Sequence, residues 1–135
     1  MKVVIDTNVF LSGIFWAGPA GDVLELWAND RIELVASPAI MEEYERVLAE
    51  MDRKEPERAD FWRLFIAQYS TTIDPPARFR ICRDPKDDMF LDCAVTAGAK
   101  CLVSGDKDLR VLRKVAGVEI LTPRAFLDRF FPLPG

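Results

Sequence analysis

The sequence predicts one α/β domain, spanning residues 1–135, with a mainly parallel central sheet. Short β-branched runs alternate with amphipathic helical segments, which is the pattern of such sheets. The chain has 135 residues, half of them apolar and 30% charged, enough to bury the core of one domain. We expect no membrane association, because no apolar run is long enough to span a bilayer. We also expect a cytoplasmic location, because Asp6 interrupts any secretory signal and the three cysteines have no metal-like spacing.

Each element has its own signal in the chain. Strands are expected at residues 2–5, 33–36, 101–104 and 118–121, with a short or extended segment over 71–83. Helices are expected over residues 20–29, 38–51, 55–68, 88–98 and 108–114, with a last helix from 123 to before Pro132. Ser37-Pro38 and Thr122-Pro123 are typical helix starts, with a capping hydroxyl followed by proline. Residues 9–16 are apolar but interrupted, and Ala17-Gly18-Pro19 ends them.

Acidic residues follow the predicted strands. Asp6 ends the first strand, and Asp106 follows the strand at 101–104. Because ligand sites of parallel sheets lie beyond the carboxyl ends of the strands, we expect both to face one crevice. Glu43, in the helix after the second strand, and Asp88, in the first turn of its helix, are further candidates. Carboxylate oxygens are the ligands that Mg²⁺ and Mn²⁺ prefer.

The chain contains no histidine, which excludes Ser-His-Asp and Cys-His catalysis and every histidine-based metal site. Taken singly, each acid also has an ordinary explanation: a helix cap, a solvated side chain or a turn residue. Only their combination favours a functional site.

Four motifs in this order resemble the PIN-domain (PilT N-terminus) family, over nearly the whole chain, and especially the VapC-like toxins of toxin–antitoxin pairs. They are Val4-Ile5-Asp6-Thr7-Asn8-Val9, Ser37-Pro38-Ala39-Ile40-Met41-Glu42-Glu43-Tyr44-Glu45-Arg46-Val47-Leu48, Asp84-Pro85-Lys86-Asp87-Asp88-Met89-Phe90-Leu91 and Leu102-Val103-Ser104-Gly105-Asp106-Lys107-Asp108-Leu109. The resemblance implies a three-layer α/β/α sandwich and a metal-dependent endoribonuclease that acts on RNA.

The resemblance places the acidic site on Asp6, Glu43, Asp88 and Asp106, with Asp108 as a further acid. Asp6, Asp88 and Asp106 are the expected ligands of Mg²⁺, with Mn²⁺ as a substitute, and Glu43 would ligate through water or orient the nucleophile. We prefer Glu43 to Glu42 because it precedes Tyr44, which takes the family's apolar position.

Asp88 is preferred to its neighbour Asp87 because it precedes Leu91 and Val95 by three and seven residues, so that its side chain points inward. Supporting roles are expected for three polar residues. Thr7 and Ser104 would offer hydroxyls to a metal-bound water or a phosphate, and Asn8 would fix the loop after the first strand.

Other functions stay open at this stage. An aspartate-nucleophile phosphatase would want an acid where Asn8 stands, and a phosphoacceptor receiver domain would want an acidic neighbour for Asp6. A catalytically inactive, RNA-binding PIN-like module is the third alternative. The net charge of −4 argues against nucleic-acid binding by overall charge. Two basic clusters, at Arg78, Arg80 and Arg83 and at Lys107, Arg110, Arg113 and Lys114, either hold a substrate phosphate or are simply solvated.

The resemblance also implies a cognate antitoxin as a partner. In addition, the aromatic residues are more numerous than one small core needs, which predicts a homodimer. The residues concerned are Trp16, Trp27, Phe126, Phe130 and Phe131.

Overall fold

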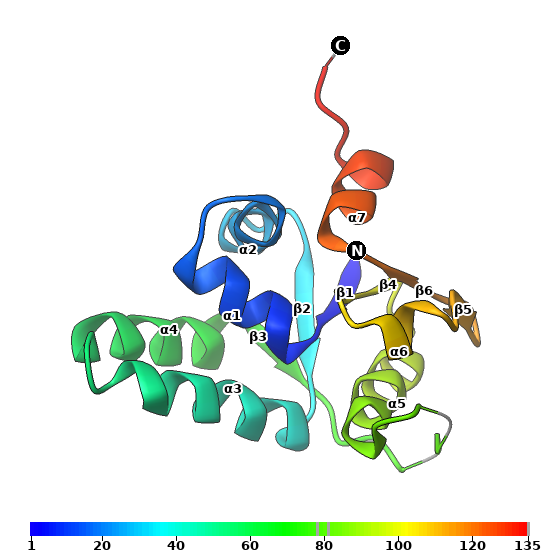
Figure 1. Cartoon of the computed structure of the whole chain (residues 1–135), viewed down its shortest axis with the longest axis horizontal. Helices are drawn as coiled ribbons and strands as arrows, with labels where there is room; N and C mark the ends of the chain where they lie inside the picture. The colour runs from blue at the N-terminus through cyan, green and yellow to red at the C-terminus, as the bar shows by residue number, and fades with distance from the viewer. Residues whose placement is uncertain (78, 81, 135) are drawn as a thin grey trace.

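The computed structural model describes residues 1–77, 79–80 and 82–134, and these form six strands and seven helices (Figure 1). The strands are β1 (Lys2–Ile5), β2 (Glu33–Ala36), β3 (Ser70–Thr72), β4 (Cys101–Val103), β5 (Lys114–Val115) and β6 (Val118–Leu121). The helices are α1 (Thr7–Phe15), α2 (Pro19–Ala28), α3 (Pro38–Met51), α4 (Pro56–Tyr69), α5 (Asp88–Ala97), α6 (Lys107–Arg110) and α7 (Pro123–Phe130). One 3-10 turn, η1 (Pro85–Asp87), leads directly into α5.

All six strands belong to one sheet in the order β3-β2-β1-β4-β6-β5, and only β5 is antiparallel to its neighbour. Strand β1 pairs with β4 in the register Val3 to Cys101 and Ile5 to Val103. The chain moves from β1 to β2 in one direction and from β4 to β6 in the other. The order of strands therefore reverses between β1 and β4, which is where ligand sites of such sheets lie. The predicted α/β fold with a mainly parallel sheet is confirmed.

Helices cover both faces of the sheet. Crossovers between parallel strands are right-handed, so the connections β1–β2 and β2–β3 place α1 to α4 on one face of the sheet. The connections β3–β4 and β4–β6 run across the sheet in the opposite direction and therefore place α5 and α6 on the other face. Figure 1 shows this separation, with α1 to α4 on one side of the strands and α5 and α6 on the other. The three-layer arrangement expected from the family resemblance is confirmed.

The two predicted helix starts are confirmed by their hydrogen bonds. The Ser37 hydroxyl accepts a hydrogen bond from the backbone of Ile40 at 3.3 Å, and the Thr122 hydroxyl accepts one from Ala125 at 3.1 Å. Each satisfies an amide that the first helical turn leaves without a partner.

Two segments differ from the prediction. The apolar stretch at 9–16 is interrupted in sequence, but residues 9–15 belong to α1 and Trp16 is its C-cap, because the Asp6 carboxylate caps the start of this helix and Gly13 permits its close packing on α2. A Cβ atom on Gly13 would lie 2.5 Å from Leu24 Cδ1, so no larger residue fits without movement. The helix expected over 108–114 ends at Arg110, since Lys114 pairs instead with Glu119 in the β5–β6 ladder.

The aromatic residues that suggested a homodimer divide into three groups. Trp27 and Phe126 are 3% and 0% exposed and belong to the core, whereas Trp16 is 65% exposed. Phe130 and Phe131 pack partly against the core. The core thus accounts for more of these rings than the sequence suggested. The dimer itself stays a prediction.

Among the described residues, no single helix is long and apolar enough to cross a membrane; α1 and α2 reach that length only as a pair, bent by 91°. All three cysteines are free thiols.

Candidate metal centre

The first part of the site lies where β1 and β4 end side by side. The Asp6 amide donates to the Val103 carbonyl at 3.1 Å, which extends the pairing of these strands by one residue. One Asp6 carboxylate oxygen accepts from the amide of Val9 at 2.8 Å, and the other accepts from the Ser104 hydroxyl. Asp6 and Ser104 are 4% and 0% exposed. The pairing of β1 with β4 therefore brings together the buried side chains of Asp6 and Ser104, which are 98 residues apart in the chain, and fixes their relative orientation.

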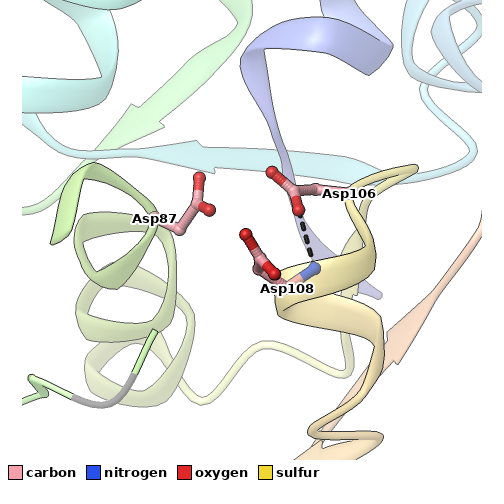
Figure 2. Close-up of side chains that lie close together, drawn as sticks. All are labelled: Asp87, Asp106 and Asp108. Carbon is pink, nitrogen blue, oxygen red and sulfur yellow. Dashed lines mark hydrogen bonds between the residues drawn. The ribbon is translucent and has the colours of Figure 1, made fainter. Parts of the chain in front are cut away.

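The second part is the loop between β4 and α6. Asp106 donates its amide to the Ser104 hydroxyl at 3.0 Å, so Ser104 links this loop to Asp6. The Asp106 carboxylate caps α6 by accepting from the amide of Asp108 at 2.8 Å. Both carboxylates are half-buried. The cap holds the side chains of Asp106 and Asp108 on the side of α6 that faces α5 (Figure 2).

The third part comes from η1, at the start of α5. Figure 2 shows the Asp87 side chain pointing toward Asp106 and Asp108 across the space between α5 and α6. One oxygen from each of these three carboxylates lies within 4.8 Å of the other two. We call Asp87, Asp106 and Asp108 the acidic cluster.

The electrostatics of the acidic cluster favour a bound cation. Burial and the negative charge of Asp106 raise the pKa of Asp87 from its ordinary value of 3.8 to about 7. Burial also raises the pKa of Asp6, against the effect of its hydrogen bonds with Ser104 and Val9. In the described part of the chain, no lysine or arginine forms an ion pair with the cluster. Like charges at such spacing repel unless a proton or a cation neutralises them.

The donor set fits a hard divalent cation. Asp87 Oδ2 is buried and has no hydrogen-bond partner among the described residues, although carboxylate oxygens in such positions are normally paired. Three convergent carboxylates match the preference of Mg²⁺ for a few carboxylates, with water as its other ligands. The acidic cluster therefore has the composition and the unsatisfied oxygen of a Mg²⁺ or Mn²⁺ site.

The structure places Asp88 differently from its neighbour. Asp88 is 7% exposed, and its carboxylate accepts from the amide of Cys82 at 3.0 Å. The low exposure of Asp88 agrees with the inward direction that the sequence pattern predicts, and Asp88 is not among the three carboxylates that converge in the acidic cluster. Asp87, the residue that was not preferred, is the one beside Asp106. Asp87 is the last residue of the 3-10 turn η1, and the helical pattern of α5 carries no signal for that turn.

Glu43 lies on α3, in a helix that is tied to the end of β1. The adjacent Tyr44 is 1% exposed and donates its hydroxyl to the Ile5 carbonyl, one residue before Asp6. The Glu43 carboxylate is half-buried and accepts from Arg46 at 2.9 Å, whereas Glu42 is exposed. The structure thus favours Glu43 over Glu42 as the less exposed acid, and its part in the site stays a prediction.

The remaining predicted residues surround these elements. Thr7 is the first residue of α1 and is half-buried, while Asn8 is exposed. Arg80 and Arg83 are exposed, and Arg78 lies outside the described residues. In the second basic cluster Arg110 is half-buried, and the others are exposed: Lys107, Arg113 and Lys114.

The fold has three layers, and its acidic residues gather where the order of the strands reverses. The protein is therefore an α/β domain with a carboxylate site. The sequence profile of the PIN domain matches residues 2–108, and the chain belongs to the PIN-domain family. This membership decides against the receiver-domain and phosphatase alternatives, and leaves the inactive PIN-like module open.

The chain is also similar to a relative in sequence and to two solved structures in fold. An uncharacterized protein of Methanocaldococcus jannaschii, MJ1680, is 32% identical over 143 residues, covering 96% of this chain and 92% of the relative. The fold is also similar to VapBC2 from Rickettsia felis, crystallised with a DNA fragment from its promoter. The TM-score is 0.60 at 16% identity, over 89% of this chain and 97% of the other. Mycobacterium tuberculosis VapC20, a sarcin-ricin loop cleaving toxin, gives a TM-score of 0.55 at 15% identity, over 84% and 97%.

Proposed function

We propose that this protein is a Mg²⁺- or Mn²⁺-dependent endoribonuclease. The observation that carries the proposal is the convergence of Asp87, Asp106 and Asp108, with a buried oxygen on Asp87 that has no hydrogen-bond partner in the part of the chain that the structure describes. Membership of the PIN-domain family supports it. The acidic cluster would hold the cation, and Asp6 would complete the site from the adjacent end of β1. Asp88 stays a sequence-based candidate ligand, which the substitutions described below test against Asp87.

The chain's own residues would prepare the site for phosphodiester hydrolysis. When bound, a divalent ion supplies a more acidic water and neutralises charge on the phosphate. Ser104 orients Asp6 and the Asp106 amide through its hydroxyl, so the two strand ends are fixed relative to each other. Glu43 would orient the attacking water, and Thr7 would offer a hydroxyl to a metal-bound water or the phosphate. The buried strands beneath these groups exclude water from one side.

The cleavage experiment uses labelled single-stranded RNA of mixed sequence with the full chain and Mn²⁺. We expect fragments that disappear with EDTA and with Asp106→Asn. The matched control is Asp128→Asn, because Asp128 is an exposed acid on α7, outside the acidic cluster. Binding of RNA without cleavage under any of these conditions would favour the inactive PIN-like module instead.

We further propose that the nuclease is the cytoplasmic toxin of a toxin–antitoxin pair and forms a homodimer. The fold it shares with chains from VapBC2 and VapC20 supports this role. An antitoxin segment that presents an arginine to the acidic cluster would inhibit by competing with the cation for negative charge. A small DNA-binding protein encoded directly next to this gene would support the pairing. Light scattering that gives a monomer at tens of micromolar concentration would overturn the dimer and leave the nuclease proposal intact.

A further inference from the structure

The described residues between β3 and η1 (73–77, 79–80 and 82–84) belong to no helix or strand, yet hydrogen bonds fix this segment at three points. The Ile73 amide donates to the Ala36 carbonyl at 2.9 Å, which prolongs the β2–β3 pairing. The Phe79 amide donates to the Asp92 carboxylate at 2.9 Å, and the Cys82 amide donates to Asp88 at 3.0 Å. Two of the three attachments are therefore carboxylates of α5.

Asp88 and Asp92 form a pair of anchors along one face of α5. They are four residues apart, about 6 Å along the helix axis, and each is 7% exposed. Asp92, the later residue on α5, binds the amide of Phe79, and Asp88, the earlier one, binds the amide of Cys82. The loop therefore runs antiparallel to α5. A hydrogen bond from an amide to a carboxylate is stronger than one between neutral groups. These two bonds thus set the path of the loop.

Ile73, Phe79 and Cys82 of this segment pack partly against the core, and cavities lie beside the loop. One, of about 440 Å³, is lined by Arg80 and Asp92 with Phe79, Asp88 and other neighbours. Another, of about 300 Å³, also has Asp92 in its wall. Both share Ala77, Met89 and Asp92, so they adjoin along the first turns of α5. We call the two adjoining cavities the groove. Asp92 lies where they meet, and Asp88, which lines the larger one, follows Asp87 in the chain.

We propose that Asp92 is a positioning residue that holds Arg80 at the wall of this groove, where Arg80 binds a backbone phosphate of the RNA strand. The proposal rests on the nuclease function proposed above and names how its substrate is held. Arg80 is exposed and lines the larger cavity. Because the chain has a net charge of −4, it can attract RNA only through local positive charge, which Arg80 supplies at the groove. The guanidinium group also presents N–H donors in pairs, which match two oxygens of a phosphate group.

The test is a double-mutant cycle on RNA affinity. A fluorescein-labelled single-stranded RNA of 20 nucleotides is titrated with the full chain in EDTA, at several salt concentrations. Arg80→Ala should weaken binding and reduce the slope of log affinity against log salt by about 0.7, as expected for one lost phosphate contact. Asp92→Ala should produce the same two changes, and the double variant should lose nothing further.

The direction of the Asp92→Ala effect is decisive, because the simple loss of a negative charge would tighten RNA binding. Asp92→Ser, too short to reach the Phe79 amide, repeats the test if the alanine variant does not fold. Asp92→Asn keeps an acceptor oxygen and should restore both affinity and slope. Tighter or unchanged binding in the folded alanine or serine variant, or a loss that adds to that of Arg80→Ala, would overturn the proposal. A wild-type chain that neither binds nor cleaves RNA would instead remove the nuclease function itself.

Discussion

The carboxylate of Asp87, at the start of α5, faces that of Asp106 across the space between α5 and α6 (Figure 2). Asp87 directly precedes α5 and Asp106 follows β4, the next strand along the chain, so the two residues stand at the two ends of one helix–strand unit. Their mutual repulsion is one reason that the pKa of Asp87 rises to about 7, after its burial. An arrangement that is unfavourable without a cation is suited to bind one.

Mn²⁺ or Mg²⁺ should stabilise the fold, because a cation relieves the repulsion within the acidic cluster and binds only the folded state. At a free ion concentration one hundred times the dissociation constant, the gain in the free energy of unfolding should be about 2.7 kcal/mol. Thermal unfolding with each ion and with EDTA measures it, and Asp106→Asn should remove most of the gain. An unfolding temperature that is the same with millimolar ion and with EDTA would contradict the site.

Asp87→Asn and Asp88→Asn should have different effects on Mn²⁺ binding. Asp87→Asn removes a carboxylate from the acidic cluster and should abolish measurable Mn²⁺ binding and RNA cleavage, with the fold retained. Asp88→Asn keeps an oxygen that can accept from the Cys82 amide and should bind Mn²⁺ like the wild type. Isothermal titration of both variants decides between them. The opposite result would restore the ligand that the sequence pattern favoured.

This pair shows what the sequence could and could not predict. The strand ends follow from β-branched runs that stop at an acid, so the positions of Asp6 and Asp106 were predictable. The helical period of Leu91 and Val95 also gave the inward direction of Asp88 correctly. What it could not give was the 3-10 turn at Pro85–Asp87, whose last residue, Asp87, points toward Asp106 and Asp108. The loop attachments of Asp88 and Asp92 depend on tertiary contacts and leave no local signal.

The metal-free protein should become less stable as the pH rises from about 4 to 7. The pKa of Asp87 is about 7 in the folded state, and its ordinary value of 3.8 applies in the unfolded state. At a pH between these two values, the folded state therefore binds more protons than the unfolded state. Stability then falls with rising pH, and the raised pKa of Asp6 acts in the same direction. Urea denaturation in EDTA at several pH values measures the trend. Asp87→Asn should flatten the profile, and a wild-type profile that rises through this range would contradict the assignment.

Tyr44→Phe should destabilise the fold because it removes the donor for the Ile5 carbonyl beneath Asp6. The Tyr44 hydroxyl is buried, and its loss leaves a buried acceptor without its partner. Such a loss costs about 1–3 kcal/mol in the free energy of unfolding. Tyr69→Phe is the matched control, since Tyr69 is 59% exposed and surface substitutions change stability by less than about 0.5 kcal/mol. Equal denaturation midpoints for the two variants would show that this hydrogen bond does not hold α3 to the end of β1.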